Sequence, residues 1–230
     1  DPPDREVLAI VEEWTLATSE RLRPRLIERK TGGFIRECHG DLHLGNIVLG
    51  DAGRITVFDC IEFNEDLRWI DVINDLAFLI MDLRFRGAGA FAQRVLNTYL
   101  EYSGDFAGAT LLIYYQVYRA MVRAKVNAIQ TRQDSVSEVD RAIACDQCSA
   151  YLPLALALTQ PEISFLLITH GVSGSGKSRQ TGHLLEQFPG AIRIRSDVER
   201  KRLFGLGPLD DSGSTLGGGL YTSDASARTY

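Results

Sequence analysis

The eight residues 171–178 constrain the fold of this chain more than any other feature. They read Gly-Val-Ser-Gly-Ser-Gly-Lys-Ser and fit the pattern G-x-x-x-x-G-K-[ST] at every fixed position. An apolar run, Ile163 to Thr169, precedes them, and a helix predicted from about Lys177 to Phe188 follows. A second predicted strand, Ala191 to Ile194, completes a β-α-β order, which is the start of a parallel sheet.

The chemistry expected of this segment, which we call the phosphate loop, is the binding of a triphosphate. Glycines let the main chain curl until successive amides point inward, and the N-terminus of the next helix adds partial positive charge. Lys177 is then expected to reach the β- and γ-phosphates and the Ser178 hydroxyl to bind Mg²⁺, so ATP and Mg²⁺ are the expected cofactors. An ordinary Gly/Ser turn is the alternative. The expected nucleotide-binding residues are Gly171, Ser173, Gly174, Ser175, Gly176, Lys177 and Ser178.

Candidate catalytic residues follow the second predicted strand. Asp197 comes at its C-terminal end, where ligands bind in open parallel sheets, and a carboxylate there can accept a proton from an attacking hydroxyl. Arg200, one helical turn later, can hold an anionic substrate group. Helix capping by Ser196 or Asp197 is the alternative for this position. Residues 193–202 include five basic and two acidic side chains, which suits an anionic substrate or a solvated basic helix face.

A second phosphotransfer pattern occupies residues 38–46, Cys-His-Gly-Asp-Leu-His-Leu-Gly-Asn. It has the H-x-D-x-x-x-x-N spacing of a kinase catalytic loop. Asp41 is expected to orient or deprotonate the acceptor hydroxyl, and Asn46 and Asp59 to hold Mg²⁺ against the nucleotide phosphates. His39 and His43 are predicted to pack and hydrogen-bond rather than to react, with a ligand or catalytic role as the alternative for His43.

Composition narrows the class of protein. The 230 residues are 45% hydrophobic with a net charge of −5, which is typical of a globular chain and argues against nucleic acid as a partner. Apolar runs fall short of a bilayer span, so we expect no membrane partner and a cytoplasmic location. Four scattered cysteines exclude a disulfide framework. Cys145 and Cys148 are predicted to be small helix residues, with a metal or redox site as the alternative.

Apolar spacing predicts the organisation of the chain. A helix or helix pair is expected over Val7 to Arg29, and a hairpin is expected from the β-branched runs 47–49 and 55–58. Glycines from 205 to 219 predict a mobile loop. The fold class is therefore mixed α/β, with a mostly helical domain at 1–160 and the start of a parallel-sheet P-loop NTPase domain at 161–230. Further helices are expected over Trp69 to Leu83, Phe91 to Tyr102, Ala109 to Ile129 and Val136 to Leu158.

Both motifs resemble known families. The phosphate loop followed by Ser-Asp-Val-Glu-Arg at 196–200 resembles the small P-loop kinases, which implies that Asp197 is the general base and that Arg200 contacts substrate. His-Gly-Asp-Leu-His-x-Gly-Asn at 39–46 is similar to the aminoglycoside phosphotransferase and choline kinase-like family, and the likeness covers roughly residues 30–130. It implies a kinase-like C-lobe and transfer of the γ-phosphoryl of ATP to a small-molecule hydroxyl. It also implies that Asp71 or Asp75 braces the catalytic loop, with helix capping as the alternative.

The order of the two regions resembles bacterial fusions of an aminoglycoside phosphotransferase with an ATP-binding P-loop domain, truncated at both ends. No strand-rich ATP lobe precedes His39 and no later strands follow residue 194, so weak or no turnover is expected. The predicted function is ATP-dependent phosphoryl transfer to a small-molecule hydroxyl, with an anionic substrate as one option. The alternatives are a nucleotide-gated regulator with a pseudokinase module, a non-catalytic interaction protein, and a nucleic-acid kinase using the basic residues 193–202.

Overall fold

The computed structural model describes residues 2–161, 163–172, 174–211, 213, 220 and 222–229. The chain divides into two compact units. Unit 1 comprises Asp1–Ala88 and Gly108–Leu167, and unit 2 comprises Gly89–Ala107 and Ile168–Tyr230. The predicted boundary near 160 lies close to the Leu167 division, but unit 2 also takes in residues 89–107, which were predicted to belong to the first domain.

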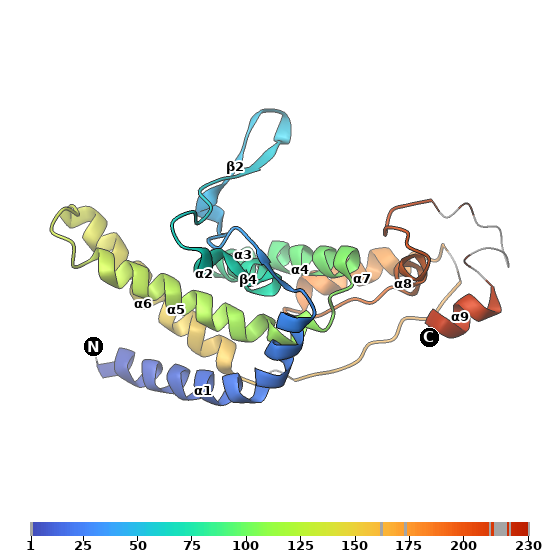
Figure 1. Ribbon diagram of the computed structural model, residues 1–230, viewed down its shortest axis with the longest axis horizontal. Coiled ribbons are helices and arrows are strands. Elements are labelled where there is room, and N and C mark those ends of the chain that lie inside the picture. Colours follow the sequence, from blue (N-terminus) through green and yellow to red (C-terminus); the bar gives the residue numbers. More distant parts are fainter. Residues whose placement is uncertain are drawn as a thin grey trace. The chain divides into compact units, whose positions relative to one another are not determined.

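Unit 1 is built on four helices: α1 (Pro2–Thr31), α3 (Val72–Phe85), α5 (Leu112–Gln130) and α6 (Glu138–Thr159) (Figure 1). Each contributes apolar side chains to one core, and the rings of Phe85 and Tyr151 stack with centroids 3.9 Å apart. Pro24 lies inside α1, and the axis of that helix changes direction near its C-terminal end, as expected where a proline removes an N–H group (Figure 1). The core residues are Val11, Phe78, Met81, Val117, Ala120, Ala124, Tyr151, Leu152 and Ala155.

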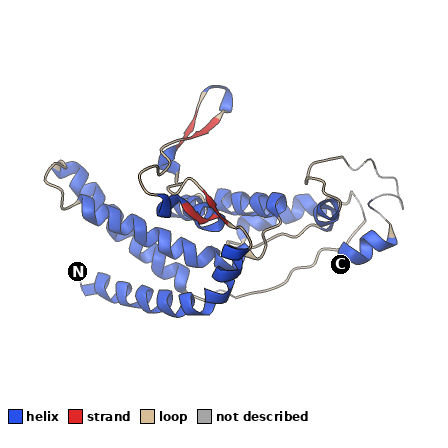
Figure 2. Ribbon diagram, viewed as in Figure 1, coloured by secondary structure: helices blue, strands red, loops and turns tan. Residues whose placement is uncertain are grey.

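Unit 1 also contains four short strands. Strand β1 (Ile35–Glu37) pairs antiparallel with β4 (Trp69–Asp71), and β2 (Ile47–Leu49) pairs with β3 (Ile55–Val57) in the predicted hairpin (Figure 2). The single turns η1 (Leu44–Asn46), η2 (Asp51–Gly53), α2 (Glu65–Arg68) and η3 (Gly108–Leu111) connect these elements. The helix predicted from Trp69 begins instead at Val72, because the Asp71 side chain accepts the Ile73 amide and caps α3.

Unit 2 contains α4 (Gly89–Ser103), α7 (Lys177–Gln187), α8 (Ser196–Leu203) and α9 (Ser223–Thr229). The predicted strands at 163–169 and 191–194 are wrong for the part of the chain that the structure describes, where both segments are coil and no parallel sheet forms (Figure 2). Ile163 is 93% exposed and Leu166 is 85% exposed, so within that part this apolar run has no strand to pair with. The main chain of 190–193 is instead hydrogen-bonded by side chains of α4.

The structure also bears on the predictions for the cysteines, for the loop 205–219 and for a membrane-spanning segment. All four cysteines are free, with Cys145 exposed and Cys148 half-buried on α6. The mobile loop predicted for 205–219 falls partly on residues 212 and 214–219, which lie outside the described residues. Within the described ranges α6 has the length and mean hydropathy, 1.2, of a helix able to cross a membrane, with 28% of that window buried. A helix in the core of a bundle can have the same length and mean hydropathy. Helix α6 supplies Tyr151 and Ala155 to the core.

Candidate functional site

The loop 38–46 is held by a carboxylate from α3. Asp75 is buried, and its two oxygens accept the His39 and Gly40 amides, each at 3.0 Å. Gly40 has φ +82°, and a Cβ there would lie 2.8 Å from the Leu67 carbonyl oxygen, so only glycine fits this close approach. Asp75 is therefore the bracing carboxylate that the resemblance implied.

Asp71, the other candidate for that bracing role, acts elsewhere. It is 2% exposed and makes a two-bond ion pair with Arg29 of α1, at 2.6 and 2.8 Å. It also caps α3, so the capping alternative holds for Asp71 and the bracing role for Asp75. This buried pair fixes the end of α1 to the start of α3.

Two further side chains, from α5 and α3, bind this loop, and the sequence did not predict either contact. Arg119 of α5 donates through Nη1 to the Gly40 carbonyl at 2.9 Å and through Nε to the Asn74 side-chain oxygen at 2.7 Å. Asp82 of α3 accepts the Leu44 amide at 2.9 Å. Both lie at helical spacing among apolar core residues, and a charged residue inside such a stripe is the signal that points to them.

The structure brings Asp41 and Asn46 together. Asn46 Nδ2 donates to an Asp41 carboxylate oxygen at 3.1 Å and to its main-chain carbonyl at 3.0 Å. Because Nδ2 is used in both bonds, the side-chain oxygen Oδ1 is the atom with which Asn46 would bind a cation. Phe58 donates its amide to the Asn46 carbonyl at 3.0 Å, and exposed Asp59 is the next residue along the chain.

Mg²⁺ bound with nucleotide phosphates needs only one or two protein carboxylates. Asp41, Asn46 and Asp59 therefore have the donor chemistry for such an ion, with Asp59 held at φ +60°. Across the described ranges no group of three or more His, Cys, Asp or Glu side chains forms a ready metal site. The predicted metal role of Asn46 and Asp59 thus depends on the phosphates as additional ligands.

The two histidines of the loop hydrogen-bond within it, as predicted. His39 Nε2 donates to the Phe58 carbonyl at 2.8 Å, and its Nδ1 accepts the Asp41 amide at 3.3 Å. His43 Nδ1 accepts the Gly45 amide at 3.0 Å, and its Nε2 lies 3.3 Å from an Asp41 carboxylate oxygen. Each ring therefore uses both nitrogens in holding the loop.

Electrostatics favour an ionised Asp41. Burial raises the pKa of its carboxyl, but the hydrogen bond and positive charge of His43, with the Asn46 amide and Arg123, bring the pKa below its ordinary value. In contrast, burial and the charges of Asp75 and Asp71 raise the pKa of the neighbouring Cys38 thiol to about 11. A thiol with that pKa is a poor nucleophile.

The phosphate loop leads directly into a helix, as the motif requires. Gly176 has φ +83° and immediately precedes α7, while Gly171 and Gly174 also have positive φ. Lys177 extends its ammonium back over the loop and donates to the Gly171 and Val172 carbonyls at 2.6 and 2.7 Å. The N-cap of α7 is Gly176, which has no side chain to satisfy the first amides of the helix, so these amides are suited to an anion.

The other predicted loop residues that the structure describes lie in the same bend. A Cβ on Gly171 would lie 3.0 Å from Ser175 Oγ, and the φ of +152° there is one that residues with a side chain rarely adopt. Ser178 is exposed in the first turn of α7, where its hydroxyl would bind Mg²⁺. Ser173 lies outside the described residues.

Asp197 and Arg200 lie on α8. The N-cap of this helix is Arg195, so the capping alternative for Ser196 and Asp197 is wrong. The Asp197 carboxylate makes two bonds to the Arg195 guanidinium, at 3.3 and 2.7 Å, and among the described residues no hydrogen bond joins it to the phosphate loop. Arg200 is buried, at 9% exposed, rather than displayed to solvent.

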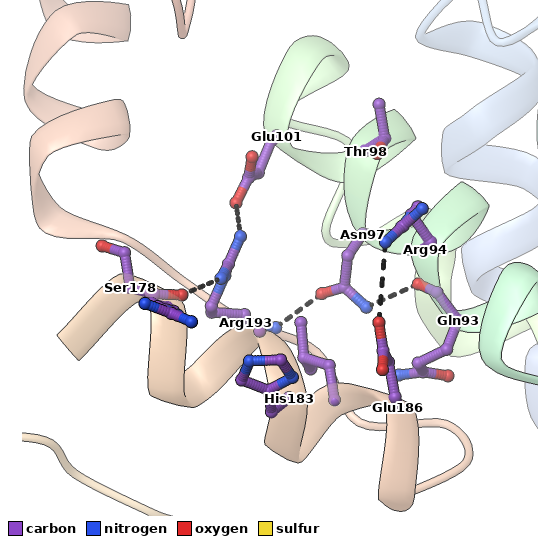
Figure 3. Close-up of a pocket in the computed structure, with 12 residues that line it drawn as sticks. Gln93, Arg94, Asn97, Thr98, Glu101, Ser178, His183, Glu186 and Arg193 are labelled. Carbon is purple, nitrogen blue, oxygen red and sulfur yellow. Dashed lines mark hydrogen bonds and ion pairs between the residues drawn. The ribbon is translucent and has the colours of Figure 1, made fainter. Parts of the chain in front are cut away.

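A pocket of about 280 Å³ lies between α4 and the 178–193 segment (Figure 3). Its lining is polar and its charges are largely paired: Arg193 lies 2.8 Å from Glu101, and Arg94 lies 3.6 Å from Glu186. Arg193 also donates to the Ser178 carbonyl at 3.1 Å. The pocket therefore adjoins the last residue of the phosphate loop.

Comparisons with known proteins agree with both motifs. Residues 2–112 match the family described as "Phosphotransferase enzyme family", and residues 166–230 match the family described as "AAA domain". These matches confirm the predicted order of the two regions. No solved structure matches the chain.

Three curated relatives are each 35% identical to the chain over 190 residues. Two are from Mycobacterium tuberculosis, strains H37Rv and CDC 1551, and one is from Mycobacterium bovis; all three are described as uncharacterized proteins. The match covers 83% of this chain but 36% of each relative, so the chain corresponds to a minor part of their length.

Proposed function

We propose that the chain is part of an ATP-dependent phosphotransferase that binds Mg-ATP at the phosphate loop and moves the γ-phosphoryl group to a hydroxyl of a small molecule. The observation that carries the proposal is the position of Lys177 at the start of α7, with its ammonium 2.6 and 2.7 Å from two loop carbonyls. A triphosphate entering the bend would exchange these carbonyls for phosphate oxygens, which bind an ammonium more strongly.

The residues of unit 2 have separate roles in this proposal. Lys177 and the α7 amides bind phosphate, Ser178 binds Mg²⁺, Asp197 accepts the proton of the attacking hydroxyl, and Arg200 orients an anionic group of the substrate. Catalysis of this kind depends on positioning and charge neutralisation. We propose a cytoplasmic protein whose acceptor is a small molecule rather than a nucleic acid.

Unit 1 carries the second, independent part of the proposal. Asp41 would orient an acceptor hydroxyl, and Asn46 and Asp59 would bind Mg²⁺ with the nucleotide supplied by an ATP lobe. Support comes from the Asn46–Asp41 hydrogen bond and the depressed pKa of Asp41. The resemblance of residues 39–46 to the aminoglycoside phosphotransferase and choline kinase-like family suggests an alcohol-bearing small molecule as the acceptor.

Nucleotide titration of the full chain tests the proposal. We expect Mg-ATP to bind, and Lys177→Ala to weaken binding by about a hundredfold, because a charge-assisted phosphate contact contributes about 1.5–3 kcal/mol. Lys125→Ala, at an exposed lysine of α5, is the matched control and should bind as the unaltered chain does. Equal affinity of the Lys177→Ala variant and the unaltered chain would contradict the proposal.

One observation favours a second candidate, a nucleotide-gated regulator. Both carboxylate oxygens of Asp197 are already bonded to the Arg195 guanidinium within the chain. A chain in which Asp197 is only an ion-pair partner would bind or hydrolyse ATP without transferring phosphate. An ATPase rate that needs no acceptor and is unchanged by Asp197→Asn supports this candidate and contradicts the first.

A further inference from the structure

One face of α4 buries two carboxamide side chains. Gln93 is 2% exposed and Asn97 is 4% exposed, although carboxamide side chains are usually found at the surface. They are separated by one helical turn, and the Asn97 amide nitrogen also donates to the Gln93 carbonyl at 3.0 Å. Buried carboxamides need partners, so these two define a polar contact surface on α4.

The partner of this surface is the main chain of 190–193 (Figure 3). The Gly190 amide donates to Gln93 Oε1 at 2.9 Å, and the Arg193 amide donates to Asn97 Oδ1 at 2.8 Å. The Ala191 carbonyl accepts from both carboxamide nitrogens, from Asn97 at 3.0 Å and from Gln93. The two side chains therefore satisfy the main-chain groups that a neighbouring strand would otherwise satisfy.

One turn further along α4, Glu101 binds the side chains of the same segment. Its carboxylate lies 2.8 Å from Arg193 and 3.8 Å from Arg195, and it is 15% exposed. Arg193 in turn donates to the Ser178 carbonyl at the end of the phosphate loop, and Arg195 holds Asp197. A continuous set of contacts thus leads from α4 to Ser178, the proposed Mg²⁺ ligand, and to Asp197, the proposed base.

We infer that Gln93, Asn97 and Glu101 of α4 are positioning residues for the phosphate loop: they hold segment 190–195 so that Arg193 fixes Ser178 and Arg195 fixes Asp197. The inference rests on the proposed function, because it assigns α4 to the nucleotide site. This role belongs to neither family region alone. Helix α4 lies within the first matched region, residues 2–112, and the main chain that it holds lies within the second, residues 166–230.

Hydrogen exchange on the full chain tests the contact itself. In Asn97→Ala the Arg193 amide loses its acceptor, and we expect it to exchange about tenfold faster or more, the scale of one lost hydrogen bond. Asn97→Asp is the matched variant, because it keeps an acceptor for Arg193 and should leave that amide protected. Equal exchange of the Arg193 amide in the unaltered chain and the Asn97→Ala variant overturns the inference.

Titration with Mg-ATP tests the positioning role. Glu101→Gln keeps the shape of the side chain but removes the charge that holds Arg193, and we expect it to weaken Mg-ATP binding by about tenfold. Arg94→Gln breaks an ion pair between α4 and Glu186 of α7 that does not involve segment 190–195, and should bind Mg-ATP as the unaltered chain does. A charge exchange, Glu101→Arg with Arg193→Glu, should recover part of the affinity lost in either single variant.

The outcomes separate this inference from the function on which it rests. If the unaltered chain binds Mg-ATP and Glu101→Gln binds equally well, the positioning role is wrong and the proposed function stands. If Arg94→Gln weakens binding as much as Glu101→Gln does, α4 acts only through general packing, and the positioning role is again wrong. If the unaltered chain does not bind Mg-ATP, the proposed function fails and the positioning role fails with it.

Discussion

Asp75 shows how single residues shape the loop 38–46. One carboxylate accepts two consecutive amides, His39 and Gly40, and the main chain of this loop depends on it. Removing an acceptor from a buried amide costs about 1–3 kcal/mol. We expect Asp75→Ala to lower the free energy of unfolding by about 3 kcal/mol, measured by urea denaturation. Asp66→Ala, at an exposed aspartate of α2, should change it by less than about 0.5 kcal/mol.

The titration of Asp41 provides the second test at this scale. The pKa of Asp41 lies below its ordinary value of 3.8 because His43 and Asn46 offset the effect of burial. Ionised Asp41 therefore stabilises the folded chain above that pH, and the stabilisation is lost as pH falls through the lower, folded-state pKa.

In His43→Phe we expect the Asp41 pKa to rise, so that the loss begins at higher pH. Carbon-13 NMR titration of the Asp41 carboxyl measures this shift, with exposed Asp66 as the internal control. An unchanged Asp41 titration would contradict the assignment of His43.

Among the elements, α7 depends on the conformation of the residue that precedes it. Gly176 has φ +83°, and no described atom lies within 4 Å of where a Cβ would stand, so substitution there costs only backbone strain. We expect Gly176→Ala to destabilise unit 2 by about 1–2 kcal/mol. Gly182→Ala, inside α7, should instead stabilise it by about 0.5–1 kcal/mol, because alanine favours the helix more than glycine does. The added Cβ has room there, since it would make an ordinary 3.8 Å contact with Arg193. Thermal unfolding of both variants checks the opposite signs.

The elements that sequence predicts well are those with local causes. Apolar spacing predicts α4, α5 and α6 to within about three residues, and the turn at 50–53 predicts the β2–β3 hairpin. The segments 163–169 and 191–194 have equally strong strand composition, but a strand also needs a paired neighbour, and no local pattern supplies one.

The candidate sites divide in the same way. The positions of Asp41 beside Asn46 and of Lys177 and Ser178 at the start of α7 were predictable because each motif lies within a single loop, and the roles of these residues stay predictions. Arg119, Asp82 and Gln93 were not, because each acts on main chain that is distant in sequence, and nothing in its own segment reveals the partner.

At the scale of the whole molecule, each unit is stabilised by a different kind of interaction. Unit 1 has a continuous apolar core of residues from α1, α3, α5 and α6, whereas the contacts of α4 with segment 190–195 are mainly polar. A chain with two compact units need not unfold in one step. We expect hydrogen exchange in increasing urea to show unit 2 opening first, and Mg-ATP to delay that step alone. A single transition for both units would contradict this.

The contact between α4 and segment 190–193 also has an evolutionary consequence. Gln93 and Asn97 bind main-chain atoms, which every amino acid shares, so the identities of residues 191 and 192 can diverge without loss of the contact. Constraint instead falls on the two carboxamides, and a saturation mutagenesis screen should tolerate most replacements at 192 and few at 93 or 97.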